Sequence, residues 1–211
     1  MQQNSLTKLN ETYVDLLFNY RTNRATIYKL WDEISLKLTE SHRHYHHFGH
    51  LENLIQELEP IKAEFYDWNA VLLSVFYHDV IYHAIASDNE EQSAELAKKH
   101  LIEINCHQKT IDLVYEMIIA TKSHQISQKN DINLFTDADL SILGAEPEVY
   151  QNYAAAIRKE YNVFPDPIYI PGRKKVLLHF LKMERLFKTD YFFNKYEEKA
   201  RINIEQEFKT L

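Results

Sequence analysis

The sequence predicts an all-α fold, with about ten helices in a single domain that spans residues 1–211 and has its core over about 25–190. The chain contains only 3 Gly and 5 Pro among 211 residues, so few positions break a helix. Apolar residues recur every three or four positions, and runs of β-branched residues are few. A hydrophobic content of 45% is enough for a sizeable core. We find no internal repeat, no low-complexity segment and no Gly/Ser linker that would mark a domain boundary.

The helical spacing of apolar residues predicts four helices in the first half of the chain. The first two helices are expected over about 5–22 and 25–40, and a third from near His46, with an apolar stripe that reaches Leu58. The fourth, over about 67–82, is apolar nearly all round. We therefore expect the fourth helix to be the most buried and to lie at the centre of the fold.

Caps and breakers define the helices that follow. Ser87 or Asp88 is suited to cap a fifth helix, with Glu90 or Glu91 three residues on as in a capping box. A sixth helix is expected over about 107–122.

A short helix follows in FTDADLSIL, with Asp137 or Thr136 as its cap. Pro147 suits the first turn of an eighth helix that runs to Tyr161. The stretch NVFPDPIYIPG is expected to be the one real loop, and two last helices follow it.

Charge and composition narrow the function classes. The net charge of -7 and pI of about 5.9 argue against nucleic acid as the main partner. The single cysteine, Cys106, excludes an internal disulfide framework and suits a reducing compartment. We see no signal peptide, and no apolar run approaches the roughly 18 residues that span a bilayer. These features predict a soluble, cytoplasmic protein without a membrane partner, and they leave a homo-oligomer open.

The pair His78-Asp79 ends the apolar run WNAVLLSVFYHDVIY, where an imidazole and a carboxylate are costly to bury. A buried carboxylate without partners costs several kcal/mol, so it neutralises, pairs or binds a metal. His50 heads the apolar stripe of the third helix and therefore faces the core. Asp139 lies on the face of a later helix that continues to Leu143. Two His and two carboxylates from separate helices predict a divalent-metal site.

Neighbouring polar residues are assigned other roles. His46 and His50 are four apart and would share a helix face. The HxxxH spacing is that of zinc peptidases, but their Glu after the first His is replaced by His47. Asp137 is expected to be a cap, or an acceptor that orients a ligand His. The remaining histidines of this segment, His42, His44 and His47, are expected to form a polar loop and helix cap.

The ordered set His50, His78-Asp79 and Asp139 resembles the H…HD…D signature of the HD-domain superfamily of metal-dependent phosphohydrolases. The segments YHHFGHL, FYHDVIY, DNEEQSA, ATKSH, FTDADLSILG, IRKEY, PGR and EEKARINIEQEF together resemble a bacterial subgroup of predicted metal-dependent HD phosphohydrolases, over about residues 25–211. The resemblance implies an HD-type helical domain. It also implies hydrolysis of a small phosphorylated metabolite or nucleotide by metal-bound hydroxide.

Nucleotidases and alarmone hydrolases of this superfamily carry catalytic acids a few positions after HD, where this chain has Tyr82 and His83. The nearest carboxylates here are Asp88, Glu90 and Glu91, so Glu90 and Glu91 become the candidate catalytic acids. His124 resembles a ligand for a second metal, although a His at a helix end is also suited to a capping role.

Phosphoryl transfer requires positive charge near the phosphate. Lys122, Arg158 and Arg173 are the candidates, with Arg43 beside the first His cluster, and each is also suited to an ordinary surface ion pair. The mixed imidazole and carboxylate set accommodates Mn²⁺, Fe²⁺, Mg²⁺ or Zn²⁺, and its imidazoles favour the transition metals. Two alternatives remain open: an HD-type di-iron oxygenase, and a non-catalytic helical binding module with a structural metal.

Overall fold

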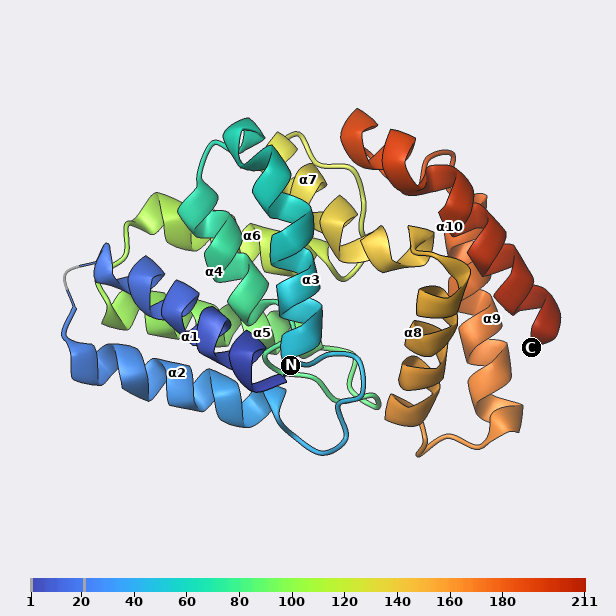
Figure 1. Cartoon of the computed structure of the whole chain (residues 1–211), viewed down its shortest axis with the longest axis horizontal. Coiled ribbons are helices and arrows are strands. Elements are labelled where there is room, and N and C mark those ends of the chain that lie inside the picture. The colour runs from blue at the N-terminus through green and yellow to red at the C-terminus, as the bar shows by residue number, and fades with distance from the viewer. Residues whose placement is uncertain (1, 21) are drawn as a thin grey trace. The chain divides into compact units, whose positions relative to one another are not determined.

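The computed structural model describes residues 2–20 and 22–211, and for residues 2–5 it describes the backbone alone. The described residues form ten α-helices and two short 3₁₀ helices, with no β-strand (Figure 1). The predicted all-α fold is confirmed. The chain divides into two compact units, residues 1–136 and 137–211, and the boundary crosses a helix. The prediction of one domain therefore stays a prediction, and each unit is described by itself.

The first unit contains six complete helices, one 3₁₀ helix and most of a seventh helix. They are α1 (Gln2–Phe18), α2 (Arg24–Leu38), α3 (Phe48–Leu58), η1 (Glu59–Glu64), α4 (Trp68–Tyr77), α5 (Asn89–Glu103), α6 (Gln108–Ala120) and α7 (Asn130–Asp139).

Helix α4 is the centre of the first unit. Every residue from Ala70 to Tyr77 is buried, and the helix packs against α1, α3, α5 and α6. This confirms the prediction for the fourth helix. The Asp67 side chain caps its start by accepting from the Ala70 N–H at 3.0 Å. The helix ends at Tyr77, five residues before the predicted end near 82, so that His78 and Asp79 lie in the turn that follows.

Helix α7 differs from its prediction. It begins at Asn130, so Thr136 and Asp137 lie inside it and neither is its N-cap. Its first turn is tied to the entrance of α4 by buried Asp131, whose carboxylate accepts from the N–H groups of Tyr66 and Asp67 at 3.0–3.1 Å. These contacts are distant in sequence, so local spacing around FTDADLSIL does not reveal them.

The second unit consists of the end of α7 and the last helices. They are η2 (Leu140–Gly144), α8 (Pro147–Glu160), α9 (Asp166–Lys182) and α10 (Asp190–Thr210). Helix α10 packs against η2 and α9. Gly144 permits the close approach of α10, because a Cβ atom there would lie 2.6 Å from the Cβ of Tyr196.

The predicted long loop NVFPDPIYIPG is mostly helical, which corrects the sequence prediction. Helix α9 begins at Asp166 and continues through Pro171. Pro167 lies in the first turn, where its missing N–H has no intrahelical partner to lose. Pro171 removes only one intrahelical bond, and Gly172 is tolerated at a cost of about 1 kcal/mol relative to Ala. The Pro and Gly residues of this stretch therefore led to the prediction of a longer loop than the structure contains.

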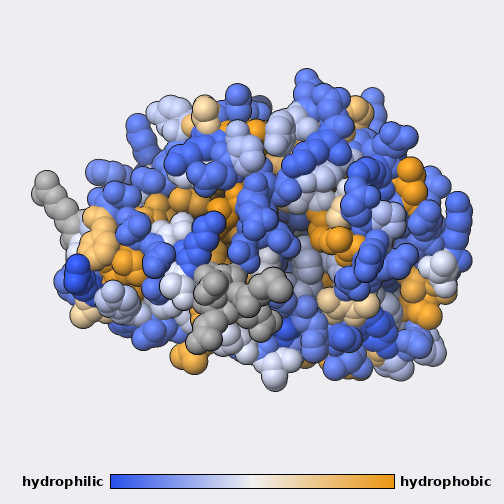
Figure 2. Space-filling model, viewed as in Figure 1, coloured by the Kyte–Doolittle hydropathy of each residue, from blue (hydrophilic) through white to orange (hydrophobic). Residues whose placement is uncertain are grey.

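The described surface is mainly polar. Figure 2 shows hydrophilic residues over most of the visible face, with apolar residues in smaller groups between them. Among the described residues, no helix combines the length and the hydropathy required to cross a membrane.

Candidate metal centre

The end of α4 fixes the orientation of the His78 ring. The ring is buried, and its Nδ1 atom lies 3.0 Å from the carbonyl oxygen of Val75, one turn back. A carbonyl oxygen can only accept a hydrogen bond, so Nδ1 carries the hydrogen and donates it. The lone pair of the neutral ring is therefore on Nε2. A metal-ligating imidazole is commonly oriented by a donor bond of this kind.

The start of α3 positions His50 in the first turn of that helix. His47 is the N-cap, and its Nδ1 accepts from the Gly49 N–H at 2.9 Å. A Cβ atom at Gly49 would lie 2.7 Å from Cε1 of His47, so glycine allows this cap to form. His46 precedes the helix, which corrects the expectation that His46 and His50 share one helix face. The expectation that His47 belongs to a cap is confirmed.

Three atoms of the first unit that can act as metal ligands converge beside this turn. The Nε2 atoms of His50 and His78 are 3.0 Å apart, and Asp79 Oδ2 lies 3.0 Å from His78 Nε2 and 3.7 Å from His50 Nε2. Ligands bound about 2.1 Å from one ion lie roughly 3.0–3.4 Å apart, so these separations suit a shared cation. One proton can join only two of the atoms, whereas a cation can bind all three.

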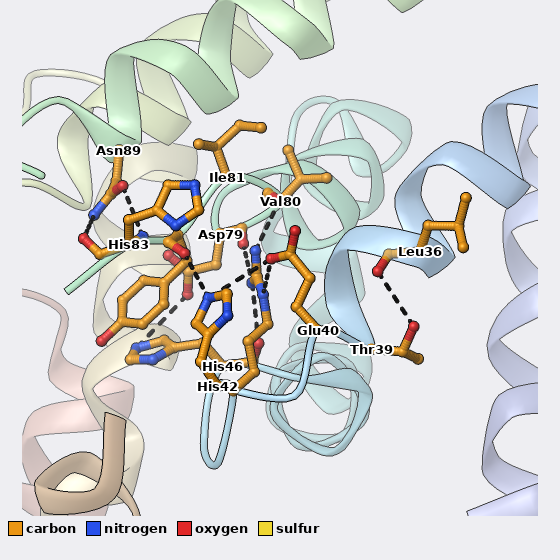
Figure 3. Close-up of polar contacts among 12 residues, drawn as sticks. Leu36, Thr39, Glu40, His42, His46, Asp79, Val80, Ile81, His83 and Asn89 are labelled. Atoms are coloured by element: carbon orange, nitrogen blue, oxygen red, sulfur yellow. Dashed lines mark hydrogen bonds and ion pairs between the residues drawn. The ribbon is translucent and has the colours of Figure 1, made fainter. Parts of the chain in front are cut away.

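The surroundings of these atoms are closed on one side and open on the other. His78 is 1% exposed and its ring meets the Phe135 ring edge to face, whereas the Asp79 side chain is 18% exposed. His46 Nε2 lies 4.0 Å from Asp79 Oδ2, and its ring stacks on Tyr82 at 4.1 Å (Figure 3). A ligand could therefore reach the carboxylate from solvent while the imidazoles are held from behind.

Tyr82 and His83, which follow the His78-Asp79 pair, make local structural contacts. Tyr82 supports the His46 ring, as described above. The backbone N–H of His83 donates to Asn89 Oδ1, and the Asn89 amide donates to the His83 carbonyl, both at 3.0 Å (Figure 3). The His83 ring stacks on His42. These contacts fix the connection from the turn that contains His78, Asp79 and Val80, here called the HD turn, to α5.

The two aspartates of α7 have different surroundings. Asp137 is fully buried and accepts from the N–H groups of Lys188 and Thr189 at 2.9 and 2.7 Å, and its carboxylate pairs with the Lys188 ammonium. It therefore serves the start of α10, whose N-cap is Thr189, and the expectation that it orients a ligand His is wrong. Asp139 is the last residue of α7.

The acidic start of α5 contains two carboxylates with different environments. Burial raises the pKa of Glu90, and the charge of Asp79 adds to that shift. The Glu91 carboxylate pairs with Lys122 at 2.5 Å, and this hydrogen bond lowers the pKa of Glu91. Lys122 also donates to the Ser87 carbonyl at 2.7 Å. The predicted N-cap position Asp88 is confirmed, but its side chain makes no capping bond, so no capping box forms.

His124 ends the segment after α6 in a left-handed conformation, with φ of 52°. Its backbone N–H donates to the Ala120 carbonyl at 2.9 Å, which closes the last turn of α6. This geometry gives the backbone of His124 the capping role that the sequence offered as one of two readings. The metal-ligand role of its side chain stays a prediction.

The arginines predicted to bind phosphate are engaged in structural contacts. Arg173 is buried and forms two hydrogen bonds with Glu207, at 2.7 and 2.9 Å. Arg158 binds Asp166 and the carbonyls that follow α8. Arg43 is also buried, and it donates to backbone carbonyls of the HD turn. Sequence reasoning noted Arg43 only as a source of positive charge and missed this structural role.

Comparisons with protein-family models, with curated proteins and with solved structures find no match for this chain. The assignment of a function therefore rests on the geometry of the site and on the residue pattern described above.

Proposed function

We propose that this protein is a metal-dependent phosphohydrolase in which His50, His78, Asp79 and Asp139 hold one divalent cation. The observation that carries the proposal is the meeting of His50 Nε2, His78 Nε2 and Asp79 Oδ2, within 3.0–3.7 Å of one another. The tautomer of His78 leaves its lone pair facing a carboxylate oxygen. A cation between them removes this repulsion and uses all three atoms as ligands.

Asp139 is included among the proposed ligands because of its position in helix α7. The Phe135 ring of that helix contacts His78, with ring centroids 5.9 Å apart. Asp139 follows four residues later in the same helix, and residues four apart lie on one face. This placement supports Asp139 as the fourth protein ligand.

The donor set suits hydrolytic chemistry at a phosphoester. When bound, a divalent cation lowers the pKa of the water it carries and neutralises charge on phosphoryl oxygens. Protein residues orient and shield the His78 ring. The Val75 carbonyl fixes its tautomer, and the Phe135 ring shields its inner side. Two imidazoles and two carboxylates suit Mn²⁺, Fe²⁺ or Zn²⁺ better than Mg²⁺.

Residues beside the ligands supply candidate acid–base and electrostatic roles. Glu90 is partly buried near Asp79, and its burial raises its pKa, which favours a role as a proton donor or acceptor. Lys122 contributes positive charge close to Glu91 at the same helix start. The resemblance to HD phosphohydrolases supports the same reaction class.

The proposed substrate is a small phosphorylated metabolite or a nucleotide. A chain with net charge -7 offers no general attraction to long nucleic acids, which require an extended basic surface. A single cysteine, which is buried, supports a location in the reducing cytoplasm.

The proposal is tested by loading the protein with Mn²⁺, Mg²⁺, Co²⁺ or Fe²⁺, measuring its metal content, and screening nucleotides and sugar phosphates for phosphate release. We expect metal-dependent turnover that is lost in Asp79→Asn. The matched control is Asp112→Asn, which changes an exposed aspartate of α6 that bonds only within its helix turn. Metal-replete protein without any hydrolysis, or full activity in Asp79→Asn, would overturn the hydrolase proposal. A visible absorption band of an iron-loaded sample that changes with oxygen would then favour an oxygenase.

A further inference from the structure

We propose that Arg43 is a positioning residue of the metal centre, which locks the HD turn so that Asp79 is presented to His50 and His78. This inference rests on the proposed function, since it concerns how the same site is held. It assigns Arg43 a task different from the phosphate binding that positive charge alone would indicate.

The guanidinium of Arg43 makes an unusually complete set of backbone contacts. Its Nη1 donates to the Asp79 carbonyl at 2.6 Å and to the His46 carbonyl at 3.1 Å, and its Nη2 donates to the Val80 carbonyl at 2.9 Å. Its Nε donates to Glu40 at 3.3 Å. The side chain is 0% exposed, so all of these bonds are formed away from water.

These acceptors belong to the segments that carry the site. Asp79 is a proposed ligand, and Val80 is the next residue of the turn. His46 lies in the segment that leads into α3, and its ring approaches the Asp79 carboxylate. Figure 3 shows Glu40, His46, Asp79 and Val80 gathered around this point. One rigid group therefore couples the end of α4 to the segment that precedes His50.

The contacts also account for where α4 ends. In a continued helix, the carbonyls of Asp79 and Val80 would accept from N–H groups four residues later. The Arg43 fork takes these carbonyls instead and stabilises the chain in its turn. The Cα of Asp79 is thereby fixed from the backbone side, while its Oδ2 atom lies 3.0 Å from His78 Nε2 and 3.7 Å from His50 Nε2.

The geometry requires a guanidinium and not merely a positive charge. Arginine presents five donors in one plane, so it can hold three carbonyls and a carboxylate simultaneously. Lysine has a single nitrogen with three donors and cannot span the same acceptors. Replacement of Arg43 by lysine therefore keeps the positive charge but loosens the turn. The variant distinguishes a positioning role of Arg43 from a purely electrostatic one.

A matched control exists elsewhere in the chain. Arg201 in α10 donates to the carbonyls of Met183 and Glu184 at 2.8 and 3.1 Å and to the Glu197 carboxylate at 2.7 Å. It is the same kind of clamp, but its acceptors all belong to the second unit and none is a proposed ligand. Arg201→Lys should therefore loosen a structural contact without affecting Asp79.

The test measures Co²⁺ affinity by competition with a chelating dye, at a temperature well below unfolding, for the wild type, Arg43→Lys and Arg201→Lys. Loss of a group that orients a ligand typically weakens metal affinity about 10–100-fold, and we expect this for Arg43→Lys. Arg201→Lys should stay within about twofold, the change expected of a site without shared partners. Thermal unfolding without metal reports the stability of each variant in parallel.

A second variant covers the case in which Arg43→Lys does not fold. Glu40→Ala removes the partly exposed carboxylate that accepts from Arg43 Nε and lies 3.6 Å from His42 Nε2, so the fold should survive. It should weaken Co²⁺ affinity in the same direction, by less than Arg43→Lys. Wild-type affinity in both Arg43→Lys and Glu40→Ala would overturn the inference, as would an equal loss in Arg201→Lys. If the wild type itself binds no Co²⁺, the proposed function fails first and the inference falls with it.

Discussion

Replacing Asp79 with Asn should stabilise the metal-free protein and abolish its stabilisation by metal. The Asp79 carboxylate oxygen lies 3.0 Å from His78 Nε2, an atom that presents a lone pair when the ring is neutral. An Asn side chain of the same shape can place its amide N–H at that position and donate to the imidazole. The substitution turns an acceptor–acceptor contact into a hydrogen bond, and it removes an anionic ligand.

The two effects have opposite signs and measurable sizes. One added hydrogen bond contributes about 0.5–1.5 kcal/mol, and a change of 1 kcal/mol moves Tm by about 2–4 °C in a chain of this length. Metal-free Asp79→Asn should therefore melt about 1–6 °C above the wild type. A metal at 100 times its Kd stabilises the wild type by about 2.7 kcal/mol, or roughly 5–11 °C, and should leave Asp79→Asn unchanged.

The assay is thermal unfolding at pH 8, where ordinary imidazoles are neutral, with EDTA or with excess Co²⁺. The curves of the two proteins should exchange order when metal is added. Asp112→Asn, an exposed substitution of the same chemistry, should follow the wild type in both conditions. A metal-free Asp79→Asn that melts below the wild type, or one that still responds to Co²⁺, would refute the reasoning about these lone pairs.

Three further predictions concern stability. Burial lowers the pKa of His100, so the unfolded chain binds the proton more readily, and stability should fall as pH drops below about 6.5. Urea unfolding of His100→Gln between pH 7 and 5 should show a flatter dependence, and an unchanged slope would contradict this cause. Arg173→Met removes the cationic partner of the Glu207 carboxylate, which then keeps only the Tyr150 hydroxyl as a donor, and should cost about 3–5 kcal/mol by urea unfolding, whereas a cost under 1 kcal/mol would argue against a structural pair. Asp131→Ala leaves the N–H groups at the entrance of α4 unpaired and should cost about 1–3 kcal/mol in the same measurement, a neutral result being the contrary outcome.

The helices and the main ligands could be predicted because their signals are local. The burial of α4 follows from its apolar composition, and the start of α8 from Pro147 in its first turn. His50 and the HD pair were identified from the cost of placing polar groups at apolar positions, and the structure brings them together within the first unit. Each of these inferences needs only the residues of one segment.

The features that were not predicted depend on contacts between distant segments. Arg43 reaches the Asp79 carbonyl across 36 positions of the sequence, and Asp131 reaches Tyr66 across 65. Nothing in the local sequence distinguishes a buried clamp of this kind from a surface charge. The extent of α9 was missed for another reason, because Pro167 and Pro171 indicated a loop although both are accommodated in the first two turns of a helix.

The central claim is that His50, His78, Asp79 and Asp139 hold a divalent cation. The most direct measurement is anomalous scattering from crystals of the protein grown with Mn²⁺ or Co²⁺, recorded on both sides of the metal absorption edge. The account predicts one strong peak about 2.0–2.3 Å from His50 Nε2, His78 Nε2 and an oxygen of each aspartate. A peak that lies elsewhere, or no peak at this position in fully loaded protein, would contradict it.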